Sequence, residues 1–109
     1  MAQPTKNKAK IEEYHLHKDQ PEKLQFEIYS LHDYLIKNIG HTEKPHIHSF
    51  YQIIWFTKGN GKHFVDFNEY EVSENKMFFI SKNQIHYFDN NINYEGIIIH
   101  FNESFLIDN

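Results

Sequence analysis

The sequence predicts an all-β domain, folded as an antiparallel barrel or sandwich. Apolar residues recur with period two far more often than with the period of about 3.6 that marks a helix. The breaks in this pattern fall at glycine, asparagine and proline, which favour turns. A chain of 109 residues is long enough to enclose one core but not two. Many short strands in one small domain are typical of a β-sandwich or a small barrel.

The first predicted strands follow a polar lead. Residues 1–23 are hydrophilic, and we expect the folded domain to occupy residues 24–109. Apolar and polar residues alternate over 24–28 and predict the first strand of that domain. A second, short strand is predicted at 34–36.

The longest strand candidate covers residues 46–57. It ends at Lys58-Gly59-Asn60-Gly61, where the Asn-Gly pair favours a tight hairpin turn. Residues 62–67 are therefore expected to return as its partner strand. Asparagines, which tolerate the left-handed conformation of turns, mark the corners of the rest of the pattern. The remaining strands are predicted at 70–72, 76–80, 85–88 and 94–101.

The last residues predict the start of a helix. Asn102 is a suitable cap, and Glu103 adds early negative charge. An apolar helical face then begins at Phe105 and stops at Asn109 before its second turn is complete. This unfinished face suggests that the natural protein continues beyond Asn109.

Composition excludes several functions. The net charge is −4 and all eleven basic residues are lysines, so the arginine that reads guanine edges is missing and phosphate is repelled. The chain contains no cysteine, which excludes a disulfide framework, a thiolate nucleophile and a cysteine metal site. Its longest apolar stretches, such as 53–56, are too short to span a bilayer. We expect a cytoplasmic protein that does not bind nucleic acid or membrane through this chain.

The candidate functional residues are three histidines and a glutamine. His46 and His48 share the parity of Gln52 along the 46–57 strand. At a rise of about 3.3 Å per residue, His48 and Gln52 would lie roughly 13 Å apart on a straight strand. A shared site therefore requires a bend between Ser49 and Tyr51. Barrel closure is expected to bring His86 beside the first two histidines in one pocket.

These residues carry a resemblance to the cupin superfamily. Its first motif, G-x5-H-x-H-x3-E-x6-G, is matched except that Gln52 occupies the glutamate position. Its second motif, G-x5-P-x-G-x2-H-x3-N, is matched by His86 and Asn90 only. The first motif is matched at Gly40, His46, His48 and Gly59, while Asn75, Ser81 and Asn83 replace the glycine, proline and second glycine of the other.

More narrowly, the chain resembles the N-terminal effector-sensing domain of AraC-type transcription regulators. The resemblance is carried by Phe50-Tyr51-Gln52, by Gly59-Asn60-Gly61, and by Ile99-His100-Phe101 through Phe105-Leu106. It implies a barrel that binds a small molecule and helps the protein to dimerise. It also implies that DNA is bound by a C-terminal pair of helix-turn-helix units, which this chain does not contain.

Two chemistries fit the candidate residues. Three imidazoles can hold nickel, zinc, iron or manganese, but Gln52 offers a neutral amide where a carboxylate would compensate the charge. We therefore favour buried, hydrogen-bonded histidines or direct contacts to a small effector, with no cofactor, over a divalent metal. Structural or surface roles are expected for the other histidines, which are His15, His17, His32, His41, His63 and His100.

The favoured function is a small-molecule sensor that binds its effector among His46, His48, Gln52 and His86. The alternatives are a metal-dependent cupin enzyme, such as a dioxygenase or isomerase, and a free-standing cupin binding protein.

Self-association is predicted from the opposite face of the 46–57 strand. Tyr51, Ile53 and Trp55 make that face apolar as well, so it needs cover from the first strand or from a second subunit. We predict a homodimer.

Overall fold

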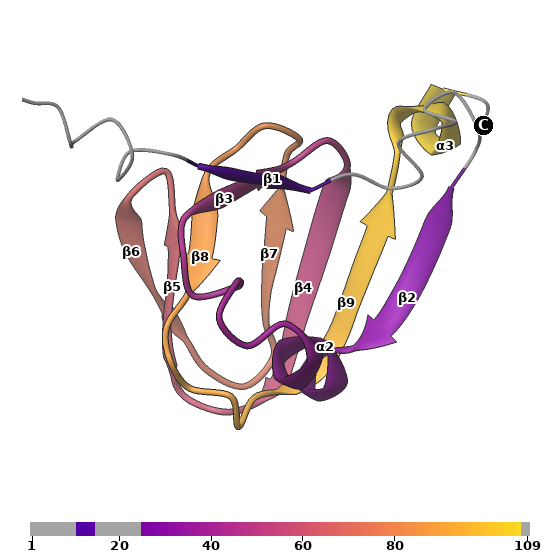
Figure 1. Cartoon of the computed structure of the whole chain (residues 1–109). Helices are drawn as coiled ribbons and strands as arrows, with labels where there is room; N and C mark the ends of the chain where they lie inside the picture. Colours follow the sequence, from indigo (N-terminus) through magenta and orange to yellow (C-terminus); the bar gives the residue numbers. More distant parts are fainter. Residues whose placement is uncertain (1–10, 15–24, 108–109) are drawn as a thin grey trace, which may run out of the picture.

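A computed structural model describes residues 11–14 and 25–107 and confirms the predicted β fold (Figure 1). Two sheets pack face to face as a sandwich. Sheet A contains, in spatial order, β1 (Glu12–Tyr14), β3 (His46–His48), β8 (His86–Phe88), β5 (Gly61–Val65) and β6 (Asn68–Val72). Sheet B contains β2 (Phe26–Ser30), β9 (Glu95–Phe101), β4 (Tyr51–Lys58) and β7 (Lys76–Ile80). Helix α2 (Leu31–Lys37) lies at the lower end of sheet B, and α3 (Glu103–Ile107) follows β9.

The apolar core lies between the sheets. Alternation along each strand turns one side chain in two inward, and α2 adds two leucines. Burying a side chain of this size contributes roughly 1.5–3 kcal/mol, so this cluster is the main source of stability. Its members are Leu31, Leu35, Ile54, Phe56, Val65, Val72, Ile80, Phe88, Tyr94 and Ile98.

The prediction of a strand at 34–36 is wrong, because these residues belong to α2. The hydroxyl of Ser30 caps the helix by accepting a hydrogen bond from the backbone N–H of Asp33 at 3.3 Å. Leu31 and Leu35, one turn apart, are both buried. Three residues of alternating polarity are too few to distinguish a strand from one face of a helix.

The prediction that residues 46–57 and 62–67 pair as a hairpin is also wrong. β4 pairs with β7 and β9, whereas β5 pairs with β6 and β8. Since both edges of β4 are occupied, the chain crosses at Gly59–Gly61 from sheet B to sheet A. A Cβ on Gly61 would lie 1.8 Å from the Tyr94 hydroxyl, so a larger residue there would displace the Tyr94 side chain. Asp66 and Phe67, which were predicted to end the strand, instead form the turn to β6.

The long strand predicted at 46–57 breaks after His48. β3 ends there and β4 begins at Tyr51, so Ser49 and Phe50 carry the chain from one sheet to the other. This is the bend that a site shared with Gln52 requires.

Turns and ends follow the sequence more closely. Asn75 and Asn83 have φ values of 66° and 68°, the left-handed conformation expected of asparagine at the corners. The predicted cap at the start of the C-terminal helix is confirmed, because the Asn102 side chain accepts a hydrogen bond from the backbone N–H of Phe105 at 3.2 Å. Strand β1 was not predicted, and Leu24 lies outside the described residues.

Within those residues, neither helix has the length and apolar character needed to cross a membrane.

The outer face of sheet B is apolar. Strand β2 pairs with the edge of β9, so it extends this sheet and does not cover Tyr51, Ile53 and Trp55 as one of our two alternatives supposed. The cross-strand register instead places Phe26 and Ile28 of β2 in the same rows as Tyr51 and Ile53 of β4, on the same face of the sheet. The outer face of sheet B is formed by Phe26, Ile28, Tyr51, Ile53, Trp55, Met77, Phe79, Ile97, Ile99 and Phe101.

Candidate functional site

Three of the four predicted site residues converge. One ligand atom each from His46, His48 and His86 lie within 4.8 Å of one another, and all three side chains are buried. Alternation along β3 turns both of its histidines inward, and the register of β8 sets His86 opposite His46. We call these three residues the histidine cluster. What it binds stays a prediction at this point.

Gln52 lies next to this cluster in a second buried pair. The break after His48 lets its side chain turn inward, where Nε2 lies 2.7 Å from Nε2 of His100. The His100 ring is 5.9 Å from the ring of His48. The fourth predicted residue is therefore connected to the histidine cluster through a residue to which we gave only a structural role.

His63 was missed in the same way. It is fully buried on β5, and its Nε2 lies 3.0 Å from Nδ1 of His86. The signal was present, since His63 and His100 share the parity of Val65 and Ile98, which are buried. Asn90 is exposed and outside the cluster.

The other histidines lie apart from the cluster or are not described. His32 hydrogen-bonds through Nδ1 to the carbonyl of Ile92 at 3.0 Å, and the His41 side chain is 57% exposed. His15 and His17 lie outside the described residues.

The buried histidines are neutral at neutral pH. Burial lowers the pKa of His46 and holds the pKa values of His48 and His86 well below the ordinary value of 6.5. It also lowers the pKa of His63 to about 3 and that of His100 to about 4. Neutral imidazole keeps one nitrogen lone pair free, which is the form that binds a metal or accepts a hydrogen bond.

The backbone fixes the tautomer of His46. Its Nδ1 lies 2.7 Å from the carbonyl oxygen of Lys44. A carbonyl can only accept, so the N–H is on Nδ1 and the lone pair is on Nε2. His46 is therefore held in the tautomer of a metal ligand.

His48, His86 and His63 form a hydrogen-bonded chain in which the N–H protons can be arranged in few ways. Nε2 of His48 lies 2.9 Å from Nε2 of His86, whose Nδ1 contacts His63. Each neutral imidazole has one N–H, so the chain can be ordered in only two directions. If the Nε2 atoms of His48 and His86 both keep lone pairs for a cation, the N–H of His86 must be on Nδ1 and donate to His63.

Unpaired polar atoms surround this chain. Nδ1 of His48, Nδ1 of His63 and Oε1 of Gln52 are buried without a hydrogen-bond partner among the described residues. Each such atom costs about 1–3 kcal/mol in lost hydration. A ligand or water that reached them would recover part of this cost.

Tyr14 covers the outer side of the histidine cluster. Its ring lies 5.4 Å from that of His46 and 5.7 Å from that of His48. It comes from β1, which pairs with β3 in parallel at the edge of sheet A. The Tyr14 carbonyl accepts from the N–H of Ser49 at 2.9 Å and so ties β1 to the break that ends β3.

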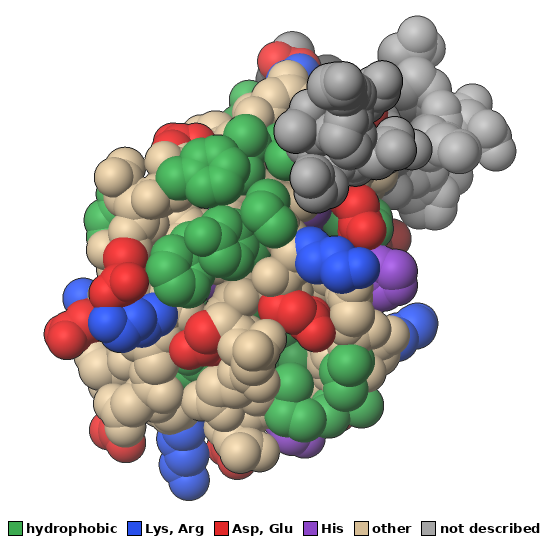
Figure 2. All heavy atoms as spheres, turned by 60° about the vertical axis from the view of Figure 1, so that its left-hand side comes forward, with side chains coloured by type: hydrophobic (Ala, Val, Ile, Leu, Met, Phe, Trp, Pro, Cys, Tyr) green, Lys and Arg blue, Asp and Glu red, His purple; other side chains and the backbone are tan. Residues whose placement is uncertain are grey.

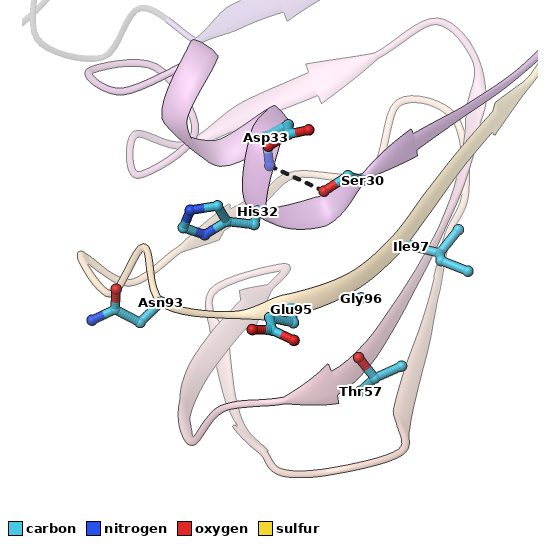
Figure 3. A pocket seen from close by; sticks show the side chains of 8 residues that line it. All are labelled: Ser30, His32, Asp33, Thr57, Asn93, Glu95, Gly96 and Ile97. Atoms are coloured by element: carbon cyan, nitrogen blue, oxygen red, sulfur yellow. Dashed lines mark hydrogen bonds between the residues drawn. The ribbon is translucent and has the colours of Figure 1, made fainter.

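A separate hollow of about 620 Å³ lies at the opposite ends of β4 and β9 (Figure 3). None of the predicted site residues lines it. Asp33 and Glu95 give it acidic character, and its surroundings include His32 and Thr57. Figure 3 shows the Ser30 side chain engaged with Asp33 at the start of α2. We place the candidate site at the histidines because three of them converge there and because Nδ1 of His48 and Nδ1 of His63 are buried without a partner.

Comparison with known proteins gives one family. The family model described as the AraC-like ligand binding domain matches residues 34–109. None of the curated proteins compared with the chain matches it.

Two solved structures are similar to the chain at low identity. The plu4264 protein from Photorhabdus luminescens is 18% identical, with a TM-score of 0.44 over 79% of this chain and 59% of that one. The EutQ protein from Clostridium difficile is 13% identical, with a TM-score of 0.45 over 82% of this chain and 64% of that one. The chain thus spans less than two thirds of either protein.

Proposed function

Because the chain belongs to the AraC-like ligand binding domain family, we propose that it is the small-molecule-sensing and dimerisation domain of an AraC-type transcription regulator. In this proposal an effector enters the barrel and shifts the equilibrium between two states of the regulator. DNA is bound through a separate C-terminal domain, in the cytoplasm. The sensor domain is residues 24–109, and β1, from the lead at 1–23, adds an edge strand to its sheet A.

The effector site is formed by His46, His48, Gln52 and His86. The observation that carries this assignment is a set of buried, neutral histidines beside unpaired atoms, namely Nδ1 of His48, Nδ1 of His63 and Oε1 of Gln52, inside an otherwise apolar core. Buried polar groups are unfavourable unless they are hydrogen-bonded, and binding pockets combine apolar walls with a few such groups.

The histidine cluster also fits a divalent metal ion, and we propose that it holds one. His46 already has its lone pair on Nε2, and the three side chains are neutral. Imidazole suits nickel, zinc and iron, and manganese is also compatible with a site that keeps oxygen ligands. When bound, the ion acts as a Lewis acid that attracts an oxygen atom of the effector. The geometry thus favours metal more than the sequence alone did.

A metal-dependent cupin enzyme is the rival proposal. Three histidine ligands leave coordination positions open, as catalytic metal sites do. We favour the sensor because of the family match.

Elemental analysis of protein purified without an affinity tag tests the site. We expect close to one equivalent of nickel, zinc, iron or manganese, lost in His46→Ala and His86→Ala. The matched control is His41→Ala, which removes an exposed imidazole and should keep the metal. Metal retained in both cluster variants would contradict the assignment.

The outer face of sheet B supports dimerisation. Ile28, Met77 and Phe79 on this face are each more than half exposed, and all ten residues of the face are uncharged. Phe105 of α3 packs on one end of this face, against Phe26 and Phe101. The remaining exposed apolar side chains mark an interaction surface. Figure 2 shows the side of the molecule formed by β5, β6 and β8, where hydrophobic side chains lie among lysine and acidic side chains. A second copy of the chain, with an identical uncharged face, matches sheet B.

Sedimentation equilibrium over a range of concentrations tests the dimer. The double variant Met77→Lys/Phe79→Lys should be monomeric, because two desolvated charges would oppose association. Tyr70→Lys, at an exposed position of sheet A, is the control and should still dimerise. A wild-type protein that remains monomeric at the highest concentration would contradict the proposal.

A further inference from the structure

The histidine cluster has no negative charge of its own. Among the described residues, the side chains whose ligand atoms converge there are all histidines. The titratable neighbours that influence His48 and His86 are likewise histidines, none of which can carry a negative charge. A divalent ion in this cluster would keep both positive charges without an anionic protein ligand.

The acidic residues around the barrel do not remove this deficit. Glu12 acts on His46, but its side chain is 36% exposed and is engaged by the hydroxyl of Tyr14. Glu27 acts on His100, outside the cluster. Surface carboxylates are screened by water and compensate a buried charge poorly.

We propose that the effector of this domain is a small organic anion, which binds the metal ion at the histidine cluster and supplies the missing charge. This inference rests on the proposed metal-binding role of His46, His48 and His86. Burying an uncompensated charge is strongly unfavourable. A neutral sugar or alcohol offers oxygen ligands without charge, whereas a carboxylate offers both, and its oxygen atoms suit manganese, iron and zinc.

Gln52 makes the metal dependent on the anion. Its amide is buried beside His100 and carries no charge, and its oxygen atom is unpaired. The protein alone therefore binds the ion less tightly than the protein with its anion bound, and the metal and the anion increase each other's affinity by the same factor. Such coupling makes occupancy of the site a measure of the anion, as a sensor requires.

Calorimetric titration of the metal-free protein with zinc tests this coupling. The titrations are run in sodium acetate, in acetamide, and in sodium perchlorate of matched ionic strength, with the weak zinc–acetate complex measured separately. Acetamide has nearly the size of acetate but no charge. We expect acetate to increase zinc affinity roughly tenfold or more, in the range typical of coupled sites, and acetamide to have no effect. The reverse titration, acetate into the zinc-loaded protein, should show the same factor.

The variant Gln52→Glu supplies the second test. A carboxylate inside the barrel should let zinc bind tightly without acetate and reduce the acetate effect to less than twofold. Gln84→Glu, the same change outside the barrel, is the control and should behave like the wild type. Circular dichroism establishes that both variants are folded.

The outcomes separate this inference from the function on which it rests. Zinc binding lost in His46→Ala but equal in acetate, acetamide and perchlorate would overturn the anionic effector and leave the metal site intact. An acetate effect unchanged in Gln52→Glu would also overturn it. Absence of zinc binding in all media would overturn the metal site itself.

Discussion

The interior of the sandwich has two unlike halves. In one, Phe56 packs against the rings of Phe78, Phe88 and Tyr94 with centroid distances of 5.0–6.2 Å, and the one polar group, the Tyr94 hydroxyl, donates to Asp89 at 2.9 Å. In the other, five buried histidines and Gln52 fill the same kind of space. In the first half, the apolar rings fill the space and the polar hydroxyl has a hydrogen-bond partner. The second leaves three of its polar atoms unpaired.

This difference separates stability from function. Apolar side chains of similar volume would satisfy the histidine half without the cost of unpaired polar atoms. Here the sequence keeps polar side chains at buried positions where apolar ones would make the fold more stable. Such conflicts between a residue and its surroundings are expected at functional sites. The predictions below test whether the two halves respond differently.

The largest expected effect is acid destabilisation that arises from the histidine half alone. The folded pKa values of His63 and His100 are lowered to about 3 and about 4, while the unfolded chain regains the ordinary value near 6.5. The unfolded state therefore binds more protons below pH 6.5, so stability is complete above that pH and is lost as the pH falls. Each such histidine contributes a slope of about 1.4 kcal/mol per pH unit.

Urea unfolding of chelator-treated protein between pH 7.5 and 4.5 measures this slope. The variant His100→Phe removes one titrating group. It should therefore reduce the slope by about 1.4 kcal/mol per pH unit, which corresponds to one proton. Stability that does not change between pH 7 and pH 5 would show that these histidines are hydrated.

In the apolar half, Phe56→Ala should lower the free energy of unfolding by about 3–5 kcal/mol at any pH. The ring fills space between three other rings, and its loss leaves a cavity. Tyr70→Ala, at a half-exposed site on β6, should cost less than about 1 kcal/mol. Urea denaturation at pH 7.5 compares the two, and a small loss in Phe56→Ala would mean that the apolar half is not the main source of stability.

The two halves also differ in how well the sequence predicts them. Period-two alternation identified most of the strands, since a sandwich repeats the same local rule along each strand. Pairing was not predictable, because nothing in the turn at Gly59–Gly61 indicates that β7 and β9 already occupy the edges of β4. Helix α2 was missed because its signal spans seven residues and only three of them were read as a strand.

In the site, local spacing was informative and long-range contact was not. The H-x-H pattern predicted that His46 and His48 share a face, and the expected barrel closure added His86. His63 and His100 carry no motif, and their roles arise from strands that meet only in the folded sandwich. Parity with buried neighbours indicates that they point inward but not which residues they contact.

A smaller effect is expected for His63, which positions a ligand without touching the metal. In the metal-bound arrangement His63 would accept from Nδ1 of His86 and so keep the lone pair of His86 on Nε2. His63→Phe should weaken zinc binding about 10- to 100-fold, as loss of such outer partners does. His100→Phe is the control and should change it little. Nitrogen-15 NMR of the zinc-loaded protein should show the His86 proton on Nδ1, and a proton on Nε2 would exclude this role.

The smallest expected effect comes from removing the Gln52–His100 pair entirely. The single variant His100→Phe leaves the buried Gln52 amide without its partner and should cost about 1–3 kcal/mol. The double variant Gln52→Met/His100→Phe removes both polar groups and keeps the volume, so its stability should stay within about 1 kcal/mol of the wild type. His100 already lies among Phe50, Tyr34 and Tyr29, which would accept a phenyl ring. Equal losses in the single and double variants would show that this pair stabilises the fold, and the two halves would then differ in composition but not in role.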